Sequence, residues 1–107
     1  MSALYTFDLE TPQELMSIVA EHVQQRRLEK GLSRQALSEM SGVPTPTIAK
    51  FERQHTISMV QFVAIAKALG YMDQIKSLLS EPRYQTQQEL ETINKNKSRQ
   101  RGRNVFH

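Results

Sequence analysis

Hydroxyl and cationic side chains are interspersed with apolar ones in the segment that follows Gly42. If residues 45–53 form a helix, Ile48 and Phe51 face inward and the polar side chains remain available on the outside. Hydroxyl and cationic groups donate hydrogen bonds to base edges and phosphate oxygens, and the major groove of DNA admits one α-helix. The segment therefore predicts a nucleic-acid-binding helix with the contact residues Thr45, Thr47, Lys50 and Arg53.

Residues that commonly carry catalysis or bind metals are sparse. The chain has no cysteine, which excludes disulfides, thiolate zinc sites and cysteine nucleophiles. No metal-ligand spacing such as HExxH links His22, His55 and His107. We interpret His22 as a packed or half-buried helix residue, and His55 as a loop residue that is either simply exposed or touches phosphate. We predict no enzyme activity, no metal and no cofactor.

The elements that must position these side chains are predicted to be helices. Thr11, Pro12 and Glu14 have the pattern of a capping box, which starts a helix over 12–30. Ser33 caps a short helix that ends at Gly42, a second short helix follows, and Ser58 with Gln61 caps a core helix that Gly70 ends. A short helix over 73–80 and a last helix beginning near Thr86 complete the chain. Because no convincing alternating strand is present, we predict an all-α fold of five to six helices.

Apolar residues at helical spacing define the expected core. Methionine is flexible and fills irregular gaps, so we expect the methionines of these helices to be core residues. The apolar side chains of the helix over 73–80 are also expected to be buried. The residues concerned are Met40, Met59, Met72, Ile75, Leu78 and Leu79.

Residues 32–53, LSRQALSEMSGVPTPTIAKFER, place two short helices around a turn centred on Gly42. This segment resembles the Cro and phage-repressor (XRE) type of helix-turn-helix, and the surrounding helices extend the similarity over about residues 27–70. The resemblance implies a lambda-repressor-like fold and a sequence-specific, DNA-binding transcriptional regulator. The matching residues are Leu32, Ser33, Leu37, Gly42, Val43, Thr47, Ile48 and Glu52.

The same resemblance implies roles for individual residues. Thr45, Pro46 and Lys50 stand at the base-reading positions of the family, with Lys50 best suited to guanine, and Arg34 stands where phosphate is bound. Arg27 and Glu52 correspond to an ion pair that joins the first helix to the end of the recognition helix. Pro44 replaces the usual Ser or Thr cap, so the start of that helix is open to a shift. The alternative for Lys50 and Arg53 is a solvated helix face.

Positive charge is concentrated at the C-terminus. The chain carries a net charge of +3, but the nine basic and eleven acidic residues before position 94 give −2. We divide the chain into an N-terminal arm (1–10), a helix-turn-helix domain (11–80), a helical extension (81–93) and a basic tail (94–107) that we expect to be disordered. The tail binds phosphate, binds an acidic groove on a partner, or only aids solubility. Its basic residues are Lys95, Lys97, Arg99, Arg101 and Arg103.

The segment after the motif, from Ile57 to the basic end, resembles HipB-like antitoxins, which are regulators encoded beside HipA-type kinase toxins. That resemblance implies a homodimeric repressor that binds operators of its own operon and holds a kinase toxin. Because two related modules read two half-sites about 34 Å apart, we predict a palindromic operator. The alternative is a protein-interaction module that inhibits a partner enzyme and binds DNA only non-specifically through the tail. With no apolar run of about 18 residues and no cysteine, we expect no membrane association and a cytoplasmic location.

Overall fold

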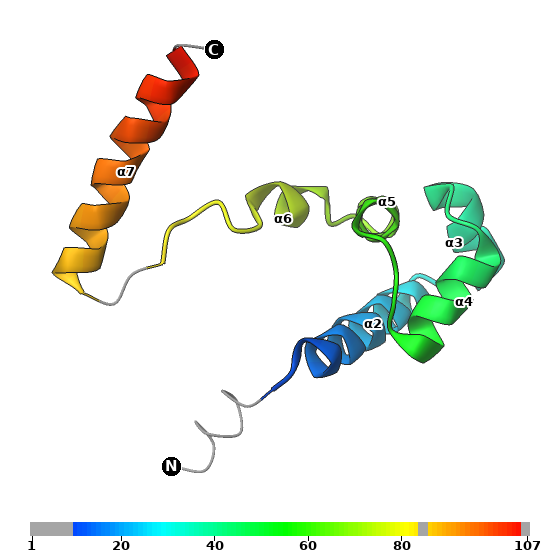
Figure 1. The fold of residues 1–107 in the computed structure, drawn as a ribbon. Helices are drawn as coiled ribbons and strands as arrows, with labels where there is room; N and C mark the ends of the chain where they lie inside the picture. Colours follow the sequence, from blue (N-terminus) through cyan, green and yellow to red (C-terminus); the bar gives the residue numbers. More distant parts are fainter. Residues whose placement is uncertain (1–9, 84–85, 106–107) are drawn as a thin grey trace. The chain divides into compact units, whose positions relative to one another are not determined.

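A computed structural model describes residues 10–83 and 86–105, with side chains described as far as Arg99. These residues form helices and no strand, which confirms the all-α prediction (Figure 1). The expected arm falls almost wholly on residues 1–9, outside the described part of the chain. The helices are α2 (Pro12–Glu29), α3 (Arg34–Ser41), α4 (Thr45–Gln54), α5 (Met59–Ala68), α6 (Met72–Ser77) and α7 (Gln87–Val105).

Local capping explains where the helices begin. Thr11 Oγ1 accepts the backbone N–H of Glu14 at 3.1 Å, and the Glu14 carboxylate accepts the N–H of Thr11, so the predicted capping box is present. Ser33 Oγ accepts the N–H of Ala36 at 3.0 Å and begins α3. Ser58 Oγ caps α5 in the same way, although its hydroxyl bonds the Gln61 side chain instead of completing a reciprocal box.

The first compact unit extends to Ile75, and its core is built where four helices meet. α4 packs against α2 and α3, while α3 also packs against α5. Leu37, Ile48, Phe51 and Ile65 are fully buried there. The ring of Phe51 meets that of Phe62 edge-on, with 6.1 Å between centroids. This packing fixes α3 and α4 to the rest of the unit.

Three methionines and two leucines that were expected in the core are exposed: Met40, Met59, Met72, Leu78 and Leu79. Met40, Met59 and Met72 lie on outer faces or first turns of their helices and are exposed. Because α6 ends at Ser77 rather than at 80, Leu78 and Leu79 lie beyond it and are 54% and 93% exposed. Ile75 of α6 was also expected to be buried, and it is half-buried.

The second unit begins at Lys76, so the compact division falls before the expected boundary at 80. Its main element is α7, begun by Thr86, whose Oγ1 accepts the N–H of Glu89 at 3.1 Å. We expected this helix to end near residue 93 and the basic tail after it to be disordered. In the structure, α7 instead continues to Val105. Lysine, arginine and glutamine are good helix formers, and no proline interrupts residues 86–105. In the described part of the chain, no helix is long and apolar enough to cross a membrane.

Candidate nucleic-acid interface

The turn between α3 and α4 is built from backbone geometry and one buried side chain. Gly42 ends α3 in the left-handed conformation (φ 78°), and its N–H donates to the Ser38 carbonyl at 2.8 Å. Val43 is buried in the core, and its N–H donates to Ser41 Oγ at 3.1 Å. These contacts set the direction in which the chain enters α4.

Pro44 starts α4 without a side-chain cap. Its carbonyl accepts the N–H groups of Thr47 at 2.9 Å and Ile48 at 3.1 Å, so the backbone alone begins the helix. Pro46 occupies the first turn, where its missing N–H costs no intrahelical bond. The helix therefore begins at Thr45, directly after the position at which the family usually has Ser or Thr.

α4 has one fully buried face and one exposed face. Ile48 and Phe51 are fully buried. Pro46, Lys50 and Arg53 recur at intervals of four and three residues and are exposed along one stripe. Thr45 and Thr47, which were expected to point outward, lie at the two margins and are half-buried.

Gln54 is an exposed polar residue that the motif does not include. It lies seven residues after Thr47, so it shares the margin of the face on which Thr47 stands. Its amide can both donate and accept hydrogen bonds. Extending the helical periodicity of the segment by one residue identifies it from the sequence.

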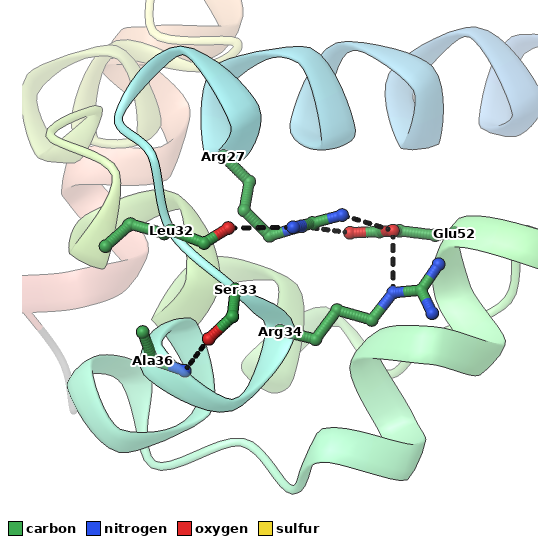
Figure 2. A network of polar contacts seen from close by, with 6 residues as sticks. All are labelled: Arg27, Leu32, Ser33, Arg34, Ala36 and Glu52. Carbon is green, nitrogen blue, oxygen red and sulfur yellow. Dashed lines mark hydrogen bonds and ion pairs between the residues drawn. The ribbon is translucent and has the colours of Figure 1, made fainter.

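A buried carboxylate joins three helices behind this face. Glu52 Oε2 accepts Nε of Arg27 at 2.8 Å, and Oε1 accepts Nη2 of Arg27 at 3.1 Å (Figure 2). Nη1 of Arg27 donates to the Leu32 carbonyl at 2.8 Å. The Glu52 and Arg27 side chains are 1% and 8% exposed. This geometry is the ion pair that was expected between the first helix and the end of the recognition helix.

Arg34 is part of the same network, which the sequence analysis did not anticipate. Its Nε donates to Oε1 of Glu52 at 3.0 Å, and its side chain is 36% exposed. The family usually has glutamine at this position, so the motif gave no reason to expect a contact with Glu52. Arg34 lies at the first turn of α3 and bonds Glu52 of α4, and its contact with phosphate stays a prediction.

The N-terminus of α3 supplies further hydrogen-bond donors. The first N–H groups of a helix have no intrahelical acceptor, and Ser33 Oγ satisfies only that of Ala36. The N–H groups of Arg34 and Gln35 belong to the same turn, which carries the positive end of the helix dipole. Phosphate oxygens are suitable acceptors for such groups.

The histidines do not form a site. His22 is exposed on α2, so its interpretation as a packed or half-buried residue is wrong. His55 ends α4 in the left-handed conformation (φ 66°) and is half-buried, with its N–H donating to the Phe51 carbonyl at 2.8 Å. Within the described residues, no three His, Asp or Glu side chains gather in a way that could hold a metal ion.

The basic residues of the C-terminal segment lie in the second unit. Lys95, Lys97 and Arg99 are exposed on α7. The side chains of Arg101 and Arg103 fall outside those that the structure describes. Binding of phosphate or of a protein partner by this segment stays a prediction.

Comparison with known families agrees with the geometry of the first unit. Residues 23–71 match the family model described as "Helix-turn-helix", a range that includes the C-terminal part of α2, all of α3 to α5 and the Glu52 network. No curated protein and no solved structure gives a match. Residues 23–71 are thus similar to helix-turn-helix domains, which DNA-binding transcriptional regulators contain, and this match supports the resemblance to the Cro and phage-repressor (XRE) class.

Proposed function

We propose that this protein is a sequence-specific transcriptional regulator that inserts α4 into the major groove of DNA. The observation that carries the proposal is the exposed stripe of Pro46, Lys50 and Arg53 on a helix whose opposite face is fully buried. A face held by core packing keeps its side chains in a fixed register, which base readout requires. The helix-turn-helix match over residues 23–71 supports the same function.

Each residue of the interface has a distinct chemical task. Lys50 donates to O6 and N7 of guanine, and Pro46 offers apolar contact to a thymine methyl group. Thr45 and Thr47 flank the stripe with hydroxyl groups that suit base edges or phosphates. Arg53 binds base edges or phosphate further along α4, and Arg34 with the first N–H groups of α3 binds one backbone phosphate.

The proposal includes a homodimer that represses its own gene. One helix of ten residues contacts too few base pairs to select a single site in a genome. Two copies related by a twofold axis read half-sites about 34 Å apart, so the operator is a palindrome.

A finer proposal is that the protein also acts as an antitoxin toward a HipA-type kinase. It rests on the resemblance of the C-terminal part to HipB-like antitoxins. Leu78 and Leu79 are exposed on the second unit, and exposed apolar residues of this size favour a protein partner. Inhibition of a partner enzyme with only non-specific DNA binding is the competing function.

Selection from a pool of random DNA duplexes tests the proposed function. The full chain is expected to enrich one palindromic sequence with half-sites about one helical turn apart. Lys50→Ala is expected to lose the enriched base pairs, whereas the control Lys67→Ala keeps them. Lys67 is exposed in the last turn of α5 and its substitution removes the same charge.

Two outcomes contradict the proposal. If the wild-type chain enriches no sequence, its DNA binding is non-specific and inhibition of a partner becomes the better account. If Lys50→Ala enriches the same sequence as the wild-type chain, α4 does not read the bases at this position.

A further inference from the structure

Glu52 is bonded to two guanidinium groups that differ in their access to solvent. Its carboxylate accepts three N–H groups, two from Arg27 and one from Arg34. Arg27 is enclosed, with its third bond made to the Leu32 carbonyl, whereas Arg34 is 36% exposed. Only Arg34 can carry the charge of this cluster to an external ligand.

The charges of the cluster do not cancel. Arg27 and Glu52 form a bidentate pair with one positive and one negative charge, so the charge of Arg34 is left over. Arg34 uses Nε for Glu52, and Figure 2 draws no contact between its two terminal nitrogens and the other residues shown. A guanidinium held in this way presents two parallel donors with the geometry that suits a phosphate.

We propose that Glu52 is a positioning residue for DNA binding, because it orients Arg34 as a two-donor clamp on one backbone phosphate. The inference rests on the proposed function and adds a cause for the orientation of Arg34. The same carboxylate lies on α4 and bonds α2 through Arg27, so the phosphate contact is tied to the position of the reading helix. Phosphate contacts set the register of a protein on DNA, and this clamp fixes where α4 enters the groove.

The clamp requires arginine. A lysine at position 34 has one nitrogen at the end of a flexible stem, which cannot hold Glu52 and present two parallel donors to a phosphate. A glutamine has no charge to neutralise the phosphate. Arg26 offers a matched comparison outside the interface, because it also pairs with a glutamate, Glu29, and its side chain is 37% exposed. A lysine at position 26 keeps the charge and removes no DNA contact.

The test compares Arg34→Lys with the matched control Arg26→Lys and with Arg34→Gln. Affinity for a scrambled duplex is measured by fluorescence anisotropy over a salt series, so that base readout does not enter. One phosphate contact contributes about 0.9 to the slope of log K against log salt. We expect Arg34→Gln and Arg34→Lys each to lower the slope by about 0.9 and Arg26→Lys to leave it unchanged.

If Arg34→Lys has the same slope of log K against log salt as the wild-type chain, the proposed clamp is wrong, because Arg34 then acts as an unpositioned charge. A second measurement on the free wild-type chain is independent of these variants. Solvent exchange of arginine Nε–H groups is followed by NMR, and slow exchange is expected for both Arg27 and Arg34. Fast exchange at Arg34, with slow exchange at Arg27, also overturns the inference.

Failure of the proposed function gives a different result. If the wild-type chain binds selected and scrambled duplexes with equal affinity, the proposed function as a sequence-specific regulator is wrong. The slope difference between Arg34→Lys and Arg26→Lys still tests the clamp in that case, because it is measured on scrambled DNA alone.

Discussion

Replacing Arg27 by methionine is expected to destabilise the helix-turn-helix domain far more than the same change at its neighbour Arg26. Arg27→Met removes both bonds to Oε1 and Oε2 of Glu52 and the bond to the Leu32 carbonyl. Glu52 keeps only the bond from Arg34 and is 1% exposed, so water cannot replace the lost partner. Arg26 pairs with Glu29 at the surface, where both side chains are more than one third exposed.

The magnitudes separate the two variants clearly. Breaking a buried pair by removing one partner costs about 3–5 kcal/mol of folding stability. Because Glu52 keeps its bond from Arg34, we expect Arg27→Met to cost about 3 kcal/mol, the lower end of this range. An exposed pair contributes about 0–1 kcal/mol. In a domain of this size, each 1 kcal/mol lowers Tm by about 4–8 °C, so Arg27→Met lowers Tm by about 12–24 °C.

Thermal and urea unfolding, followed by circular dichroism, measures the difference. A loss of stability for Arg27→Met within about 1 kcal/mol of that for Arg26→Met refutes the assignment of the pair as a buried structural contact. The double variant Arg27→Met with Glu52→Met provides a further check. Because it removes the buried charge together with its partner, it is expected to recover most of the lost stability.

Three further perturbations have defined outcomes. Gly42→Ala meets no atom within 4 Å but forces alanine to φ 78°, so urea unfolding should show a loss of about 1–2 kcal/mol, and an unchanged midpoint contradicts the left-handed turn. Phe51→Ala empties a fully buried site and should lower the free energy of unfolding by about 3–5 kcal/mol, whereas a loss below about 1 kcal/mol contradicts the core assigned to α4. A chain ending at Ile93 should keep its preference for selected over scrambled DNA in anisotropy titrations while the salt slope falls by about 0.9 for each phosphate contact removed. An unchanged slope means that the C-terminal residues do not bind DNA.

Local patterns were sufficient to predict most of the first unit. The capping residues Thr11, Ser33 and Ser58 bond the backbone N–H groups expected of them, because a cap involves only residues three positions apart. The pair of Arg27 and Glu52 was accessible only through the family resemblance, since 25 residues separate its members.

Other features depend on contacts that spacing does not encode. Arg34 bonds Glu52 because the N-terminus of α3 meets the C-terminal half of α4, and a helical pattern within either segment cannot show that meeting. Leu78 and Leu79 are apolar, as core residues usually are. They are exposed because α6 ends at Ser77, before them. Alternating basic residues suggested a disordered segment after position 93, although their individual helix propensities are compatible with α7.

Reading of DNA bases by α4 is tested most directly by the affinity of the wild-type chain and of Lys50→Ala for two DNA duplexes. One duplex is the region upstream of the gene for this protein, and the other is its scrambled sequence, both followed by fluorescence anisotropy across a salt series. The wild-type chain is expected to bind the upstream duplex at least tenfold more tightly, with two chains per site, and Lys50→Ala is expected to lose most of this preference. Equal, weak and steeply salt-dependent binding of the wild-type chain to both duplexes contradicts base reading by α4.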